Sequence, residues 1–274
     1  MSRKKISINS GVLEDLYLRR NLSPYKIAGI LNCSFTTISN RLREYSIPLK
    51  SPSFARMRYA KYDFDEDLVN KAYIIGFRIG DLNVYKPTEN SETIIVRCHT
   101  TQYEQVEVMK SLFESFGHVQ ISCNKQHFHV NCYLNGSFDF LLDSVDDMLG
   151  WIKKRSHSLA FIAGYVDAEA NLIINQGKAR FKIDAYDKEV LQWISNWLSE
   201  NNIENKLGKI YKRGQILKWR KPFRKDLWRL NINHGSSIER FLLASLPYLK
   251  HSKRIADAKL CLENVKTRRK NGTI

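Results

Sequence analysis

Apolar residues recur at helical spacing in the first fifty positions of the chain. They predict one helix around residues 12–18, a second that begins at residue 24 and a third over Phe35–Tyr45. Ser23 and Pro24 mark the second start, because serine caps a helix and proline suits its first turn. Asn32 lies in the following turn, where asparagine tolerates left-handed backbone. The apolar positions of this predicted helical module are Val12, Leu13, Leu16, Leu18, Ile27, Ala28, Ile30, Leu31, Ile38 and Leu42.

The third predicted helix is apolar on one side, at Ile38 and Leu42, and polar on the other. A helix-turn-helix has this arrangement, and the outer face of its second helix reads the base edges of DNA. A three-helix module that binds another protein is the alternative. The stretch from Lys50 to Tyr62 is basic and weakly periodic, so we expect residues 51–67 to be a linker that lies on phosphates. The candidate DNA contacts of the module, residues 1–50, are Thr36, Thr37, Ser39, Asn40 and Arg43.

The rest of the chain contains two versions of one pattern, over residues 68–150 and 151–264. Each version begins with an apolar helix, continues in strand-like runs and then has an amphipathic helix. These helices are Ala72–Gly80 and Glu104–Phe116 in the first version, and Leu159–Ala168 and Lys188–Glu200 in the second. The runs Val96–Gln102 and Phe181–Asp187 match at an offset of 85 residues. The repeat predicts a pseudo-twofold pair of α+β units followed by a basic tail, residues 265–274, whereas two unrelated segments are the alternative.

Alternation along the predicted strands places apolar side chains, such as Ile121 and Cys123, on one face of each sheet and polar side chains on the other. The polar face of the first unit carries Arg97, His99, Thr101, Gln120, Ser122, Asn124, His127, His129, Asn131 and Tyr133. The polar face of the second unit carries Lys182, Asp184, Tyr186, Arg229, Asn231 and Asn233. Such hydrogen-bonding groups suit the base edges of a major groove, whereas an ordinary half-solvated sheet is the alternative.

The same alternation argues against a zinc site. Cys123, His127, His129 and Cys132 have the residue types of a zinc cluster. On paired strands, however, the two cysteines belong to the apolar face and the two histidines belong to the polar face. The four side chains therefore do not converge on one ion.

Small residues stand four apart in both apolar helices, at Gly76 and Gly80 in the first and at Gly164 and Ala168 in the second. Residues four apart share a helix face, so these positions allow two helices to approach closely. An acid follows the second small residue in each copy. These acids, Asp81 and Glu169, meet if the helices pack about a pseudo-twofold axis. Adjacent carboxylates repel unless a cation lies between them, and a hard divalent ion such as Mg²⁺ suits them.

The charge of the chain makes a polyanion its expected partner. The 274 residues include 44 lysines and arginines against 28 acids, which gives a net charge of +16. A protein this basic with paired acids predicts metal-assisted cleavage of a phosphodiester. Residues 206–229 have ten basic residues and one acid, with Trp219, Phe223 and Trp228 interleaved. We expect a long β-ribbon there that grips phosphates, with a solvated loop as the alternative; its candidate contacts are Lys212, Arg213, Lys218 and Arg220.

Composition also bears on where the protein works. No apolar stretch approaches the ~20 residues that span a bilayer. The basic N-terminus is not followed by the apolar run of a secretory signal. The five cysteines are odd in number and scattered, as is typical of reduced thiols. We therefore expect a cytoplasmic, nucleoid-associated protein, or an organellar matrix protein if an organelle encodes it, with no membrane and no small-molecule cofactor among its partners.

The two apolar helices resemble the motif of the LAGLIDADG homing endonucleases. The nine-residue motif falls on Ile74–Leu82 and again on Ile162–Ala170, as in a single-chain, two-motif member. Its eighth position, the metal-binding acid of the family, matches Asp81 and Glu169. The sixth-position acid is present as Asp167 and replaced by Ile79 in the first copy, and the final glycine is replaced in both copies. The resemblance implies two αββαββα-type units whose saddle-shaped antiparallel sheets straddle DNA.

The resemblance also implies an activity. It is a site-specific, Mg²⁺-dependent endonuclease that cuts double-stranded DNA as a monomer at a long, asymmetric site, with Asp81 and Glu169 as metal ligands. Lys253 lies in a segment similar to one that supplies a catalytic lysine in the family, although a phosphate-positioning or solvated lysine is an equal alternative. Family members have also been recruited as non-cleaving DNA-binding regulators and as RNA intron maturases. These two activities are the alternatives for the whole chain.

Overall fold

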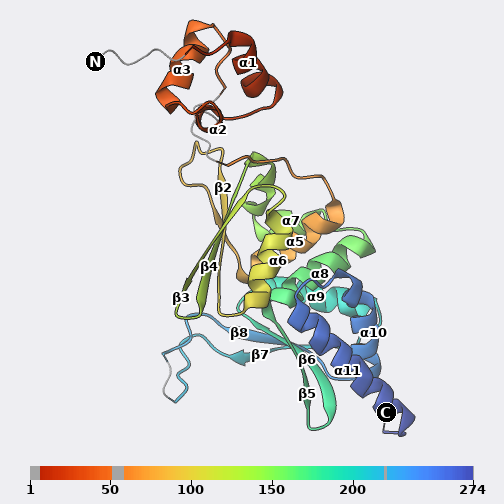
Figure 1. The fold of residues 1–274 in the computed structure, drawn as a ribbon. Helices are drawn as coiled ribbons and strands as arrows, with labels where there is room; N and C mark the ends of the chain where they lie inside the picture. The colour runs from red at the N-terminus through yellow and green to blue at the C-terminus, as the bar shows by residue number, and fades with distance from the viewer. Residues whose placement is uncertain (1–6, 51–58, 219–220, 274) are drawn as a thin grey trace.

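The chain forms two units of the same topology, preceded by a small helical module (Figure 1). The computed structural model describes residues 7–50, 59–218 and 221–273. The first unit contains α5 (Leu68–Asp81), β1 (Asn83–Tyr85), β2 (Ile94–Thr100), α6 (Tyr103–Phe113), β3 (His118–Asn124), β4 (His127–Leu134), the 3-10 helix η2 (Gly136–Leu141) and α7 (Val145–Gly150). The second contains α8 (Arg155–Glu169), β5 (Ala170–Asn175), β6 (Lys178–Ala185), α9 (Lys188–Glu200), β7 (Lys206–Tyr211), β8 (Leu227–Ile232), α10 (Gly235–Ser245), the 3-10 helix η3 (Leu246–Tyr248) and α11 (Ser252–Lys270).

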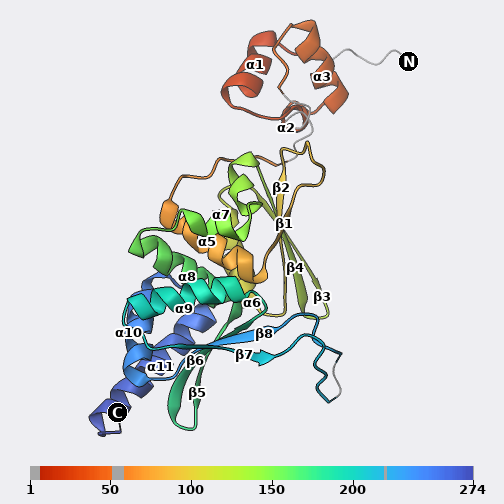
Figure 2. The same ribbon diagram turned by 180° about the vertical axis from the view of Figure 1, so that it is seen from behind.

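The strand order of the two sheets confirms the predicted α+β class and its pseudo-twofold repeat. The antiparallel orders are β1-β2-β4-β3 and β5-β6-β8-β7, so each element of the first sheet has a counterpart in the second. The matched strands β2 and β6 end at Thr100 and Ala185, at the predicted offset. Helices cover one side of the sheets and leave the other side open (Figure 2). Within the described ranges, no helix combines the length and apolar character needed to cross a membrane.

Helices α5 and α8 pack against each other at the middle of the molecule (Figures 1 and 2). A Cβ atom added at Gly76 would stand 2.0 Å from the carbonyl oxygen of Phe161, and one added at Gly164 would stand 2.1 Å from the carbonyl oxygen of Tyr73. These reciprocal contacts are related by the offset between the two motifs. The backbones therefore touch at these points, and only glycine leaves the required space.

The exposed fractions of the strand residues follow the predicted faces, except on β3. Val96, Cys98, Val130 and Cys132 are fully buried, whereas His127 is exposed. Ile121, expected on the apolar face, is 42% exposed. Cys123 is exposed as well. The reason is position, because β3 is the edge strand of its sheet and has a neighbouring strand on one side only.

The N-terminal module contains α1 (Ser10–Glu14), the π-helix η1 (Asp15–Arg19), α2 (Pro24–Ile30) and α3 (Phe35–Glu44). Ser23 caps α2 by accepting a hydrogen bond from the Lys26 amide, and Asn32 has a φ of 49° in the turn, both as predicted. Val12, Leu18 and Ile30 are exposed instead of buried. The wider turn of the π-helix changes which residues face inward, so Tyr17 takes the buried place expected for Leu18.

Residues 59–67 are not a free linker on phosphates. The Phe64 ring packs against the rings of Phe116, Phe138 and Phe140, with centroid separations of 5.4–5.6 Å. The Phe64 amide also donates to the Ser137 hydroxyl. This segment therefore belongs to the first unit, because its aromatic side chain packs there and because its four acids against one lysine do not favour phosphate. The other part of the expected linker, residues 51–58, lies outside the described residues.

Two further segments differ from the prediction. The expected basic tail from Val265 continues α11 to Lys270, because Val265 is fully buried against the second unit and extends the apolar face of that helix. The expected long β-ribbon is ordered as strands only over β7 and β8, and residues 212–226 form an irregular connection where they are described. Hydrogen bonds between Gly214 and Phe223, and between Phe223 and Gln215, close this connection.

Candidate active site

The two motif acids are the last residues of α5 and α8, and the close packing of these helices brings them together. A Cβ atom added at Gly80 would stand 2.4 Å from the Ala168 Cβ atom and 3.2 Å from the Glu169 Cγ atom. A larger residue at position 80 would therefore push the second acid away from the first. The small residues four apart thus determine the separation of the two helix ends, and with it the separation of Asp81 and Glu169.

The electrostatics of the acid pair show that the two carboxylates are in conflict. Burial and the nearby charges of Asp81 and Asp187 raise the pKa of Glu169 to about 7. Burial also raises the pKa of Asp81, and this increase is opposed by a hydrogen bond from Gln105 and by the charge of Arg254. A carboxylate with a raised pKa is stabilised by any cation placed beside it.

Gln105 is a site residue that the sequence prediction missed. It lies in the first turn of α6, and its side-chain amide donates a hydrogen bond of 2.6 Å to Asp81 Oδ2. Gln105 is only 5% exposed. The signal in the sequence is a polar residue beside the apolar face of an amphipathic helix, next to Val106. This hydrogen bond leaves the other carboxylate oxygen of Asp81 available to a ligand.

Asp167, the sixth-position acid, joins three elements of the fold. It is 2% exposed, and its Oδ2 atom accepts hydrogen bonds from the Tyr73 hydroxyl at 2.6 Å and from the Lys250 and His251 amides at 2.7 and 3.0 Å. Burial raises its pKa to about 6 against the opposing effect of these donors. Asp167 therefore ties α5 and the start of α11 to α8.

Arg254 is the basic residue whose charge acts on the acids, although Lys253 was the predicted one. The charge of Arg254 lowers the pKa values of Asp81, Asp167 and Glu169 alike. Its side chain is 13% exposed, and its buried Nε atom has no hydrogen-bond partner among the described residues. Lys253 is half exposed and pairs with Asp257 at 2.9 Å. Although the two residues are neighbours on α11, Arg254 acts on the acids and Lys253 forms an ion pair on the surface.

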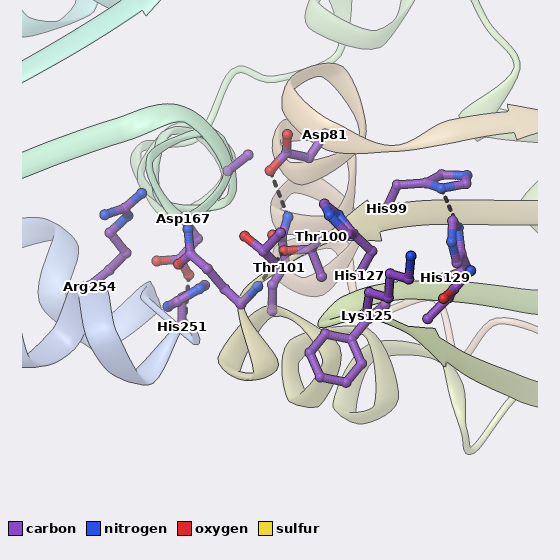
Figure 3. Close-up of a pocket in the computed structure, with 15 residues that line it drawn as sticks. Asp81, His99, Thr100, Thr101, Lys125, His127, His129, Asp167, His251 and Arg254 are labelled. Carbon is purple, nitrogen blue, oxygen red and sulfur yellow. Dashed lines mark hydrogen bonds between the residues drawn. The ribbon is translucent and has the colours of Figure 1, made fainter.

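A cavity of about 580 Å³ opens between Asp81 and the first sheet (Figure 3). The helical side of the cavity is formed by Asp81, Asp167, Arg254 and the cap residue His251. The ends of β2, β3 and β4 line it from the sheet. Five of the predicted polar-face residues lie on this wall, namely His99, Thr101, Asn124, His127 and His129. The Nδ1 atoms of His99 and His129 are 2.5 Å apart across paired strands. Burial and the charges of His129 and Arg97 lower the pKa of His99.

Other predicted DNA contacts are held by partners within their sheets. Arg97 donates to Asn131 at 2.8 Å and to the Tyr85 hydroxyl at 2.6 Å. In the second sheet, Arg229 donates two hydrogen bonds of 2.6 Å to the two oxygens of Asp184. Lys182 lies opposite Asn231 in the register of the same sheet. The hydrogen bonds of Arg97 and Arg229 fix these two guanidinium groups in place, as in a rigid surface that presents donors to a ligand.

The connection between β7 and β8 carries the remaining predicted contacts. Lys212, Arg213 and Lys218 are exposed, whereas Arg220 lies outside the described residues. Tyr186 lines a second cavity of about 630 Å³ together with residues 221–225. In the N-terminal module, Thr36, Asn40 and Arg43 are exposed on α3, and Ser39 is half-buried. Thr37 is also half-buried, where its hydroxyl lies 2.9 Å from that of the cap residue Ser34.

The acid pair fits a hard divalent cation by its chemistry. The donors are two carboxylates with pKa values raised chiefly by burial, and in Glu169 also by the charge of Asp81. Asp81 lines a cavity with room for water and a phosphate oxygen. Among the described residues no group of three or more histidines, cysteines and acids is arranged as a metal cage. Mg²⁺ is commonly bound by one or two carboxylates that leave several positions to water and substrate phosphates.

Comparisons with known proteins agree with this architecture. The fold and the paired acids define a two-unit protein of the LAGLIDADG architecture. Residues 156–243, within the second unit, match the family described as LAGLIDADG-like domain. The structure is similar to that of I-DmoI in complex with DNA and Ca and to mesophilic variants of the homing endonuclease I-DmoI. Each likeness has a TM-score of 0.52 and 20% identity, and covers 71% of this chain and 100% of the other.

A further likeness is to full-length DUF199/WhiA from Thermatoga maritima, with a TM-score of 0.48 and 12% identity, covering 76% of this chain and 63% of the other. No curated protein matches the chain. The family match and the fold confirm the resemblance to the LAGLIDADG family that the two motifs predicted.

Proposed function

We propose that this protein is a divalent-metal-dependent endonuclease that cuts both strands of DNA at a long, asymmetric site. The observation that carries the proposal is the meeting of Asp81 and Glu169 at the ends of two packed helices, where the charge of one raises the pKa of the other. The fold supports it, because I-DmoI, which is named a homing endonuclease, has the same architecture and was solved with DNA.

Asp81 and Glu169 are the residues that would hold the metal, for which we propose Mg²⁺. When bound, the ion activates a water molecule for attack and neutralises charge on the phosphate. Gln105 orients Asp81 by donating to one of its oxygens. Asp167 holds the start of α11 against α8 through two backbone amides, and so keeps Arg254 near the acids. Arg254 supplies positive charge where the negative charge of the phosphate increases during reaction.

The open faces of the two sheets are the proposed DNA-binding surface. The longest strand of each sheet, β4 in the first and β6 in the second, has eight residues and so runs about 26 Å, close to the length of ~8 base pairs. Two sheets therefore cover roughly 16 base pairs. The faces differ, with histidines in the first sheet and an Asp184–Arg229 ion pair in the second. Each sheet therefore contacts its own half-site, and a single chain acts as a monomer.

The test is a cleavage screen on a random-site DNA library with Mg²⁺, followed by variants on the selected site. Asp81→Asn and Glu169→Gln are expected to abolish cleavage and to retain DNA binding. Arg254→Met is expected to slow cleavage about 100-fold, as loss of one electrostatic stabiliser does. Lys253→Met is the matched control and is expected to cut at close to the wild-type rate.

If either acid variant cuts both strands at the wild-type rate, the shared metal site is wrong. If Lys253→Met is slow and Arg254→Met is not, the assignment of the basic residue is wrong. A wild-type protein that binds a DNA site tightly but does not cut it with Mg²⁺ or Mn²⁺ is a non-cleaving regulator.

A further inference from the structure

The segment before α5 is attached to one particular end of the first unit. The Tyr59 ring stacks on the His118 ring, with a centroid separation of 3.7 Å and an interplanar angle of 10°. The Tyr62 amide donates to the Phe116 carbonyl at 2.8 Å. Phe64 then packs into its aromatic cluster. The chain is therefore fixed to the first unit from Tyr59 onward.

This attachment point lies at the outer end of the first sheet. His118 begins β3 and pairs with Tyr133, whereas Asn124 ends β3 and pairs with His127. Asn124 and His127 line the cavity that contains Asp81, so that end of the strand faces the centre of the molecule. Six residue steps separate His118 from Asn124, which is about 20 Å along the strand. Tyr59 is thus far from the acid pair and on the first-unit side only.

The N-terminal module ends just before this attachment. Lys50 is held to the module, because its amide donates to the Tyr17 hydroxyl and its Nζ atom donates to the Tyr17 carbonyl, both at 2.8 Å. Nine residue steps join Lys50 to Tyr59, and nine steps span at most about 30 Å. The module, wherever it lies, cannot pass far beyond the outer end of the first unit.

The surface of the module is suited to duplex DNA. Its core, which includes Leu13, Ile27 and Ile38, is a separate cluster from that of the two units, so the module has a packed interior of its own. On α3 the exposed residues Thr36, Asn40 and Arg43 are spaced i, i+4 and i+7, which places them in one polar stripe opposite that core. Residues 7–50 have six lysines and arginines against three acids, which complements phosphate.

We propose that the module binds duplex DNA immediately outside the half-site of the first unit, and on that flank alone. The tether lets Lys50 lie up to about 30 Å beyond the attachment point, or roughly nine base pairs at 3.4 Å each, and the module extends the contacts from there by its own width. The short tether also keeps the module at high effective concentration over that flank, so that weak contacts strengthen binding of the whole chain. This inference rests on the proposed function, because it takes the two sheets as the DNA-binding surface.

The experiment is a hydroxyl-radical footprint of the full chain on its selected site, in Ca²⁺ to prevent cleavage. The variant Asn40→Ala combined with Arg43→Ala is expected to lose protection over one continuous stretch of DNA, on one flank only. It is also expected to bind at least tenfold more weakly, since one base contact and one phosphate contact are removed, while the cleavage position stays the same. Arg269→Ala, an exposed arginine that pairs with Glu239 outside the module, is the matched control and leaves the footprint unchanged.

The same DNA site shows which flank belongs to the first unit. The half-site of the first unit is the one whose base preference changes in His129→Ala, and the lost protection is expected to adjoin it. Loss beside the other half-site, or on both flanks, overturns the inference. Equal footprints and affinities for all variants also overturn it and indicate that the module binds protein. A wild-type chain that shows the asymmetric footprint but never cuts refutes the endonuclease proposal and leaves this inference standing.

Discussion

At the scale of single residues, Glu169 carries the electrostatic cost of the paired-acid site. Its pKa is about 7 in the folded protein, against an ordinary value of 4.5. Between pH 4.5 and about pH 7, the folded protein therefore keeps a proton on Glu169 that the unfolded chain has lost. Because the folded state binds more protons in this window, the free energy of unfolding falls as the pH rises through it. A neutral side chain at position 169 would remove this fall in the free energy of unfolding.

We therefore predict that Glu169→Gln stabilises the metal-free protein at pH 8. The expected gain is on the order of 1–2 kcal/mol, since one pKa unit corresponds to 1.36 kcal/mol and the site is partly solvated. At pH 4.5 the difference between the two proteins should shrink to about 0.4 kcal/mol, since Glu169 is then neutral in the folded protein and half ionised in the unfolded chain. Thermal unfolding of both proteins in EDTA between pH 4.5 and 8 measures the difference in stability. A gain that is equal at all pH values would contradict the charge explanation.

The same shift predicts the pH dependence of metal binding. Because a protonated carboxylate is a poor ligand, the stabilisation of the wild type by Mg²⁺ is expected to be present at pH 8 and to weaken as the pH falls below about 7. The Mg²⁺-induced rise in melting temperature should be absent at every pH in Glu169→Gln. These scans use the same samples and conditions as the stability measurement. Together they test in two independent ways whether Glu169 is the residue with the raised pKa.

At the scale of elements, the contact between α5 and α8 determines how far apart Asp81 and Glu169 lie. A methyl group at Gly164 would meet the backbone oxygen of Tyr73, which cannot move aside as a side chain can. We predict that Gly164→Ala lowers the free energy of unfolding by about 3 kcal/mol, at the upper end of the usual cost of overpacking. It should also slow cleavage, because the helices must separate and move Asp81 away from Glu169.

Gly150→Ala is the matched control for this prediction. A Cβ atom at Gly150, at the end of α7, would have no other atom within 4 Å among the described residues. Its free energy of unfolding should change by less than about 1 kcal/mol, as for glycine replaced by alanine in an open helical position. Chemical denaturation of both variants decides the matter, and similar losses in the two would mean that close packing at Gly164 is not the cause.

At the scale of the whole molecule, the two units have the same topology but different open faces. Asp184 neutralises and orients Arg229 on the second sheet, so Asp184→Asn frees the guanidinium to make other contacts. We predict that this variant changes base preference in one half-site only. Selection of preferred sites from a randomised library measures the change. A change in both half-sites would show that the units do not divide the DNA between them.

The sequence by itself determined the features that depend on local spacing. Periodicity predicted the repeated units, and the small residues four apart predicted the contact that brings Asp81 and Glu169 together. The alternation of Val96, Arg97, Cys98 and His99 predicted which face of the first sheet is open. These predictions succeeded because helix and strand geometry fix such relations within a few residues of chain.

Only the tertiary structure decided which distant side chains complete the site. Gln105, Arg254 and the amides that bind Asp167 come from α6, α11 and the segment before α11, and no spacing in the sequence relates them to the motifs. Lys253 and Arg254 are adjacent in sequence, so only the way α11 packs against α10, β5 and β6 decides which of them acts on the acids. The attachment of Phe64 likewise depends on an aromatic cluster assembled from separate segments. Burial and charge at these places depend on packing between elements, which local patterns do not encode.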